Sequence, residues 1–140
     1  MTKLDGKIAW VTGAGTGIGE AAAIALAEEG ATVVLSGRRR EPLEGVAARI
    51  TQKGGTADVQ NGDMTKKEDV QRIAAHIQAT YGRLDIAVSN AGVNITPRHW
   101  NQISYDGIEY MLDGNLTASA YVSLAAITMM RPQQDGLIIH

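Results

Sequence analysis

The chain has 140 residues, enough to bury one hydrophobic core, so we expect a single domain or part of one. Hydrophobic residues make up 44% of the sequence and charged residues 20%, a balance typical of folded proteins rather than disordered ones. The net charge of -2 at pH 7 provides no basic footprint, so neither nucleic acid nor an anionic membrane is expected as the main partner.

Cysteine is absent, which excludes disulfides, thiolate metal sites and cysteine nucleophiles and favours a cytoplasmic location. The first seven residues lack the apolar core of a signal peptide, and no apolar run approaches the roughly 20 residues that span a bilayer. His76, His99 and His140 have no metal-ligand spacing, so no metal site is predicted.

The first half of the chain alternates strand and helix signals. Residues 8–11 form an apolar run, followed by a glycine cluster and a helix-favouring segment over residues 20–29. Gly30 ends that helix, and residues 31–35 form a second strand with no polar alternation, as expected inside a parallel sheet. Residues 41–53 then favour a helix, and residues 56–60 a short strand.

The second half repeats the alternation. Val70, Ile73, Ala74 and Ile77 recur with helical spacing, whereas the opposite, polar face carries Lys66, Lys67, Glu68, Gln71 and Arg72. Residues 84–88 predict a fourth strand, residues 104–130 a long helix ended by Pro132, and residues 136–140 a fifth strand. Candidate buried positions of the long helix are Met111, Leu112, Leu116, Tyr121, Leu124, Ala125 and Ile127.

Strands alternating with helices predict an α/β fold with a doubly wound, Rossmann-like parallel sheet. About five strands are expected, and a sheet that stops on an apolar strand is expected to be incomplete.

The segment from Thr12 to Gly19, here called the glycine turn, lies between the first predicted strand and the first predicted helix. A phosphate can meet free backbone N–H groups and the positive end of the helix dipole at such a position. Glycine permits positive φ and lets the backbone approach a pyrophosphate closely. A tight turn of any α/β protein would use glycine in the same way, so the turn alone leaves both readings open.

The spacing Thr-Gly-x-x-x-Gly-x-Gly, met by Thr12, Gly13, Gly17 and Gly19, resembles the fingerprint of the short-chain dehydrogenase/reductase family. Further family landmarks appear in order, at Leu4-x-Gly6-Lys7, Asp63, Asn90-Ala91-Gly92 and Asn115-Leu116. The resemblance implies that residues 1–140 are the dinucleotide-binding, N-terminal part of a longer single-domain NAD(P)-dependent oxidoreductase. It also implies a small-molecule carbonyl or alcohol substrate and a homo-oligomer, a dimer or tetramer.

The end of the second predicted strand indicates which dinucleotide is bound. An acidic residue there would accept hydrogen bonds from the 2′-hydroxyl of NAD(H), but this chain carries Arg38 and Arg39 instead. A guanidinium suits phosphate oxygens, so NADP(H) is preferred over NAD(H), with Arg38 as the first candidate and Arg39 as the second. A solvated charge run is the alternative for these arginines.

The resemblance assigns the other cofactor contacts residue by residue. Asp63 and Met64 would contact the adenine, although residues 61–63 could also be a simple turn. The backbone of Asn90, Ala91 and Gly92 would lie beside the adenosine ribose, with a plain loop as the alternative. The pyrophosphate contacts are expected at Gly13, Thr16, Gly17, Ile18 and Gly19.

The family's proton transfer uses a serine, a Tyr-x-x-x-Lys pair and an asparagine that holds a water, and only Asn115 matches one of these. Each of the four tyrosines is followed, four residues later, by a residue other than lysine. We therefore expect the chain alone to be inactive. The alternative function is a non-catalytic dinucleotide-binding sensor or scaffold of the same fold.

Overall fold

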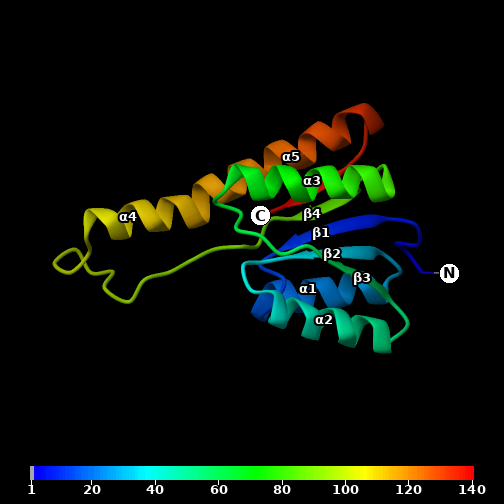
Figure 1. Cartoon of the computed structure of the whole chain (residues 1–140), viewed down its shortest axis with the longest axis horizontal. Helices are drawn as coiled ribbons and strands as arrows, with labels where there is room; N and C mark the ends of the chain where they lie inside the picture. Colours follow the sequence, from blue (N-terminus) through cyan, green and yellow to red (C-terminus); the bar gives the residue numbers. More distant parts are fainter. Residues whose placement is uncertain (1) are drawn as a thin grey trace.

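The computed structural model describes residues 2–140 and contains a five-stranded parallel sheet with helices on both faces (Figure 1). The strand order is β3-β2-β1-β4-β5. The chain adds strands on one side of β1 up to β3 and then crosses to the other side of β1 with β4, so the strand order reverses between the neighbouring strands β1 and β4. The elements are β1 (Ile8–Thr12), α1 (Gly17–Glu28), β2 (Thr32–Ser36), α2 (Arg40–Gln52), β3 (Thr56–Val59), α3 (Lys67–Tyr81), β4 (Ile86–Val88), α4 (Tyr105–Leu112), the π-helical turn η1 (Asp113–Thr117), α5 (Ala118–Gln133) and β5 (Leu137–Ile139). This confirms the predicted α/β fold and its five strands.

The central strands are buried on both faces because their sequences are apolar without alternation. Every residue of β1 is buried, and its register pairs Val11 with Leu35 on one side and with Val88 on the other. The carboxyl ends of β1, β2 and β4 therefore meet at one edge of the sheet.

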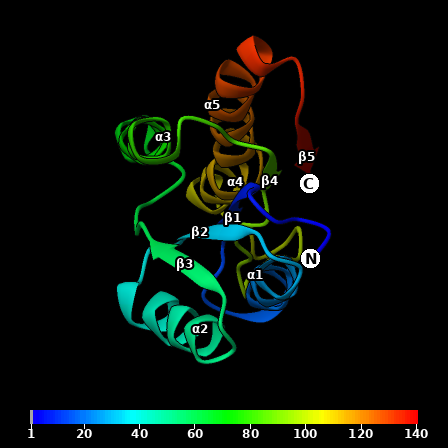
Figure 2. The same ribbon diagram turned by 90° about the vertical axis from the view of Figure 1, so that its right-hand side faces the viewer.

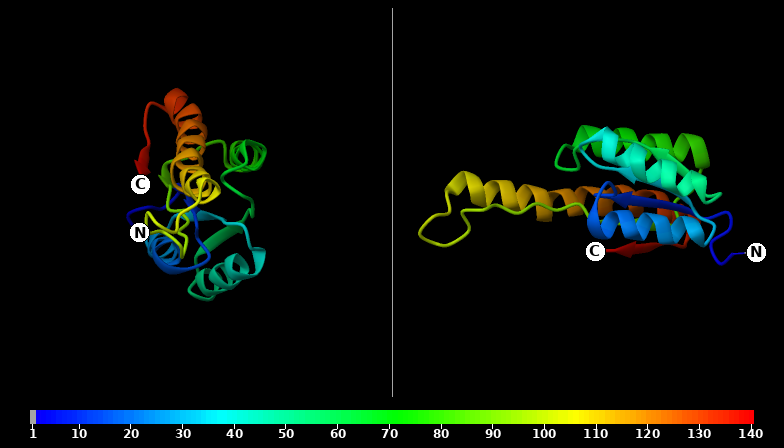
Figure 3. Two further views of the ribbon diagram at one scale, coloured as in Figure 1. Left: turned by 90° about the vertical axis from the view of Figure 1, so that its left-hand side faces the viewer. Right: turned by 90° about the horizontal axis from the view of Figure 1, so that it is seen from below.

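Two helical layers cover the sheet (Figures 2 and 3). On one face, Trp10 packs with Ile73 and Ile77 of α3 and with Val122 of α5. On the other face, Val11 and Leu35 pack with α1 and α2, including Leu43. Within residues 2–140, no helix is both long and apolar enough to cross a membrane.

The predicted long helix is present from Tyr105 to Gln133, but it contains a π-helical turn that the sequence analysis did not predict. The turn η1 separates α4 from α5, and α4 with the loop before it projects from the sheet (Figure 3). The prediction that Pro132 ends the helix was wrong, because α5 continues to Gln133 and Pro132 lies in its last turn. A proline there keeps a helical φ and removes only one N–H donor, so the turn can still close.

The buried face of this region also differs from the prediction. Leu112, Leu116, Leu124 and Ile127 are 51%, 64%, 67% and 43% exposed, so their predicted burial was wrong. Met111, Tyr121 and Ala125 are only partly buried. The residues that face the core are Ala118, Val122, Ala126, Met129 and Met130. The π-helical turn shifts the helix face, and small alanines let α5 approach the sheet closely, which side-chain hydrophobicity alone does not indicate.

Candidate functional site

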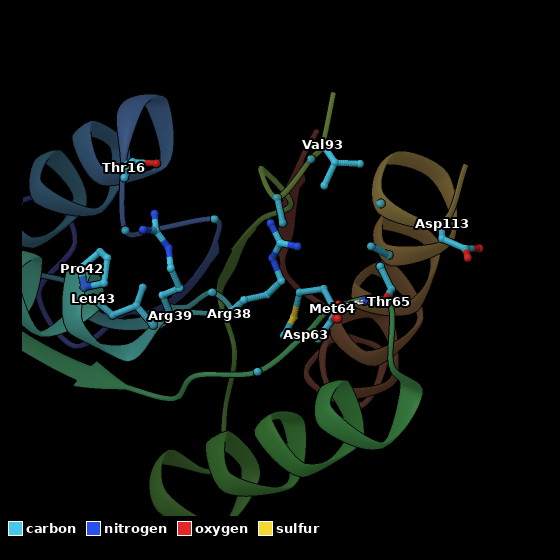
Figure 4. A pocket seen from close by; sticks show the side chains of 18 of the residues that line it. Thr16, Arg38, Arg39, Pro42, Leu43, Asp63, Met64, Thr65, Val93 and Asp113 are labelled. Atoms are coloured by element: carbon cyan, nitrogen blue, oxygen red, sulfur yellow. Dashed lines mark hydrogen bonds between the residues drawn. The ribbon is translucent and has the colours of Figure 1, made fainter. Parts of the chain in front are cut away.

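A cleft of about 380 Å³ lies at the carboxyl edge of the sheet, beside the point where the strand order reverses. Ligands of open α/β sheets bind at such switch points, and the volume suits a small-molecule site. Eight of the predicted cofactor-binding residues line it: Gly13, Thr16, Arg38, Arg39, Asp63, Met64, Ala91 and Gly92. Figure 4 shows the cleft between the glycine turn, the β2–α2 connection and the start of the β3–α3 loop.

The glycine turn leads directly into α1, which begins at Gly17, earlier than the expected start at residue 20. Gly13 and Gly17 adopt positive φ, 61° and 59°. A Cβ on Gly19 would overlap the carbonyl oxygen of Gly13 and lie 2.6 Å from the Asn90 side-chain nitrogen. The turn therefore passes so close to the start of α1 that no side chain fits there, and the first N–H groups of α1 have no helical partner.

Thr12 connects the glycine turn to the loop after β4. Its fully buried hydroxyl accepts hydrogen bonds from the backbone N–H groups of Asn90 and Ala91, both at 3.1 Å, and donates to the Val88 carbonyl at 3.4 Å. Asn90 Nδ2 also donates to the Gly13 carbonyl at 3.2 Å. Asn90 thus stabilises the glycine turn without lining the cleft, whereas Ala91 and Gly92 do line it.

Arg38 and Arg39 extend from the β2–α2 connection (residues 37–39) into the cleft, Arg38 on the side of Asp63 and Met64 and Arg39 on the side of Thr16 (Figure 4). Both are exposed, and within residues 2–140 no carboxylate forms an ion pair with either. The next arginine, Arg40, is instead bound to Glu44 at 2.8 Å. Two unpaired guanidinium groups therefore face the cleft, next to a strand end that has no acidic residue.

Asp63 and Met64 lie in the β3–α3 loop (residues 60–66). Asp63 Oδ1 accepts hydrogen bonds from the backbone N–H and the hydroxyl of Thr65, at 2.9 and 2.7 Å. Burial by itself raises the pKa of the Asp63 carboxyl, but these hydrogen bonds and the positive charge of Arg38 outweigh it and hold that pKa below its usual value. The carboxylate is therefore ionised at neutral pH, and the side chain of the next residue, Met64, is buried.

Asn115 lies in η1 and does not line the cleft. Its Oδ1 accepts from the Val93 N–H at 3.2 Å, and its Nδ2 donates to the Val93 and Met111 carbonyls, both at 2.9 Å. The side-chain amide thus pairs with Val93 as a neighbouring strand would, with both donor hydrogens engaged. Gly114 is buried against Val93, where a Cβ would overlap the valine side chain. These contacts place α4 and η1 against the loop that follows β4.

Three other predicted residues, Gly17, Ile18 and Gly19, begin α1 but do not line the cleft, and the Ile18 side chain is 80% exposed. Sequence reasoning missed Thr65, Tyr110 and Asp113, which do line it. The spacing Asp63-x-Thr65 is a local turn signal that could have indicated Thr65. Tyr110 and Asp113 reach the cleft only through the packing of α4 and η1 on the β4 loop, which leaves no local signal.

A second polar cluster lies away from the cleft, between β3 and α3. Asp58 accepts hydrogen bonds from His76 at 2.7 Å, Tyr81 at 2.8 Å and Gln60 at 2.9 Å. Burial and the bond to Asp58 raise the pKa of Tyr81 to about 12. His76 is therefore a structural contact between α3 and β3.

The comparisons with known proteins agree with this geometry. A family model described as short chain dehydrogenase matches residues 7–140. An uncharacterized oxidoreductase of Staphylococcus aureus strain MRSA252 is 41% identical over 140 residues, which cover 100% of this chain and 59% of the relative.

Solved structures show the same fold. A metagenomic short-chain oxidoreductase in complex with NADP matches with a TM-score of 0.92 and 32% identity, over 96% of this chain and 61% of that one. An NAD+-bound xylitol dehydrogenase matches with a TM-score of 0.93 and 33% identity, over 97% of this chain and 52% of that one. The glycine turn, the loop after β4 and the sheet order thus occur together in this chain as its sequence pattern predicts, and the chain belongs to the short-chain dehydrogenase/reductase family.

Proposed function

We propose that this chain binds NADP(H) in the cleft and forms the N-terminal, dinucleotide-binding part of an oxidoreductase. The hydride would pass between the nicotinamide and a carbonyl or alcohol of a small molecule, and the cofactor supplies that chemistry when bound. One observation carries the proposal: Arg38 and Arg39 lie unpaired in a cleft that also contains the glycine turn. Similar structures hold either NADP or NAD+, so the choice between them rests on this chain's own residues.

The cleft fits the chemical parts of a dinucleotide. Gly13 and Thr16 border it beside the amino end of α1, where backbone N–H groups and the helix dipole favour a pyrophosphate. A glycine at position 19 leaves the room that a Cβ would fill, which keeps the turn tight against Asn90. The glycine turn would therefore bind the pyrophosphate through its backbone.

The adenosine end would lie between the two arginines and the β3–α3 loop. Arg38 offers a planar donor fork to a 2′-phosphate, which no carboxylate at the end of β2 would repel. Asp63 is held ionised, and its second oxygen can accept a hydrogen bond from the exocyclic amine of the adenine. Ala91 and Gly92 also line the cleft, and these small residues would leave space for the ribose.

Asn115 would support catalysis by holding Val93 in place, since its side-chain amide is already engaged there. A role in a water-mediated proton path would then belong to its backbone rather than to its amide. The loop at Val93 faces the cleft, so its position bears on any ligand bound there.

The direct test is to measure, by isothermal titration calorimetry, how tightly the chain binds NADPH and NADH. We expect tighter binding of NADPH, and Arg38→Ala should weaken it about tenfold, at the low end for a charge-assisted bond because Arg38 is exposed. NADH binding should be unchanged. Arg131→Ala is the matched control, since this exposed arginine of α5 does not line the cleft. Tighter binding of NADH, or an unaltered preference in Arg38→Ala, would contradict the proposal.

A further inference from the structure

The β3–α3 loop is held from the α3 side by two residues that do not line the cleft. Asp69 Oδ2 accepts a hydrogen bond from the Asp63 backbone N–H at 2.8 Å, and Arg72 Nη2 donates to the Asn61 carbonyl at 2.8 Å. The same Arg72 nitrogen lies 3.5 Å from Asp69 Oδ1. One carboxylate and one guanidinium, both in the first turns of α3, thus bind the backbone on either side of Gly62.

The loop lies flat on α3 because residue 62 has no side chain. A Cβ on Gly62 would lie 3.1 Å from Arg72 Nη2, 3.1 Å from Asp69 Cβ and 3.2 Å from Ile73 Cδ1. The approach is tight on all three sides, so the two hydrogen bonds and the glycine together determine where the loop runs.

The other side of the same loop is bound to the strand that leads to Arg38. The Gly62 N–H donates to the Gly37 carbonyl at 2.9 Å, and the Gln60 N–H donates to the Leu35 carbonyl at 2.9 Å. Gly37 directly precedes Arg38. Residues 61–63 therefore connect α3 to both parts of the proposed adenosine site, which are Arg38 on one side and Asp63 with Met64 on the other.

We propose that Asp69 and Arg72 are positioning residues that set the separation between Arg38 and the Asp63–Met64 backbone, and so determine the affinity for the adenosine end of the cofactor. This inference rests on the proposed function, because it concerns the same cleft. Neither residue lines that cleft, and both act through the backbone of residues 61–63.

The direction in which one substitution changes the affinity distinguishes a positioning role from a purely electrostatic one. Asp69→Ala removes a negative charge from the neighbourhood of a bound phosphate, so long-range electrostatics alone would strengthen phosphate binding. Positioning predicts the opposite, a weaker complex, because the loop loses its bond at Asp63. Asp69→Asn removes the same charge but keeps an oxygen that can accept from the Asp63 N–H.

The experiment measures binding of adenosine 2′,5′-bisphosphate by calorimetry, since this probe contains the adenine, the ribose and the 2′-phosphate but no nicotinamide. Asp69→Ala and Arg72→Ala should each weaken binding about tenfold, which corresponds to about 1.4 kcal/mol. Asp69→Asn and Arg72→Lys should restore most of the affinity. Glu68→Ala, an exposed residue of the same helical turn, is the control and should bind as the wild type does.

Thermal unfolding of each variant, followed by circular dichroism, shows whether the fold is intact. Unchanged affinity in folded Asp69→Ala and Arg72→Ala would overturn the inference, as would tighter binding by Asp69→Ala. If either alanine variant fails to fold, the two conservative variants decide, and a tenfold loss in both would also overturn it. If the wild-type chain does not bind the probe, the proposed function is refuted instead. The two failures are distinguishable, because the inference is tested only by differences between the variants and a wild-type chain that binds.

Discussion

Replacing Thr12 by valine tests whether a single buried hydroxyl joins the two sides of the cleft. Valine has nearly the same shape, but it leaves the Asn90 and Ala91 N–H groups without their acceptor. Each lost partner of a buried group costs about 1–3 kcal/mol. Asn90 and Ala91 are only partly buried, so water recovers some of this, and we expect a total loss of about 2 kcal/mol in the free energy of unfolding.

The assay combines urea denaturation with amide hydrogen exchange. Thr12→Val should lower the unfolding midpoint and accelerate exchange at Asn90 and Ala91, since both N–H groups lose the same acceptor. Thr12→Ser is the matched control: it keeps the hydroxyl and loses one buried methyl, for about 1 kcal/mol, without faster exchange at those amides. A stability within about 0.5 kcal/mol of the wild type, together with unchanged exchange in Thr12→Val, would refute the reasoning.

Two further predictions concern packing and pH. Gly19→Ala should destabilise the chain by about 1–3 kcal/mol and weaken NADPH binding, because the new Cβ meets the backbone of Gly13 and forces the turn outward; urea denaturation and calorimetry measure both, and a neutral effect would contradict the tight turn. At the opposite edge of the sheet, burial raises the pKa of the Asp85 carboxyl, but bonds from Arg83 and the Ile8 N–H, with the charge of Lys7, outweigh it and lower that pKa. A lowered pKa in the folded state contributes stability above the unfolded value of about 3.9, and this stability is lost as the pH falls through the folded value. Asp85→Asn should therefore reduce stability at pH 7 but match the wild type at low pH in thermal melts, and an equal loss at both pH values would argue against the ion pairs.

Local sequence signals were sufficient for the sheet and for the glycine turn. Apolar runs such as residues 8–11 and 31–35 specify strands by themselves, and glycine spacing specifies the turn, because both depend on neighbours in the sequence. The buried face of α5 was mispredicted at Leu124 and Ile127 because it depends on the π-helical turn before it and on how closely alanines approach the sheet.

The contacts that hold the β3–α3 loop of the candidate site could not be predicted from local sequence signals either. Arg72 was placed on the polar face of its helix, and it is indeed exposed, yet its guanidinium binds the Asn61 carbonyl. That contact exists only because Gly62 lets the loop lie on α3. The sequence pattern of a polar helix face thus does not indicate which of its charged side chains bind another part of the chain. Tertiary structure is needed to identify them.

The strand order has a consequence for how the chain folds. The segment from β1 to β3 pairs strands that are neighbours in the sequence, whereas β4 must return past it to reach the far side of β1. Loop closure over that distance opposes early formation of β4, so we expect the unit of β1, β2 and β3 to form first. The Thr12 bonds to Asn90 and Ala91 can form only afterwards. A ligand that contacts both the glycine turn and the loop after β4 would therefore bind only the completed fold and, by mass action, slow its unfolding.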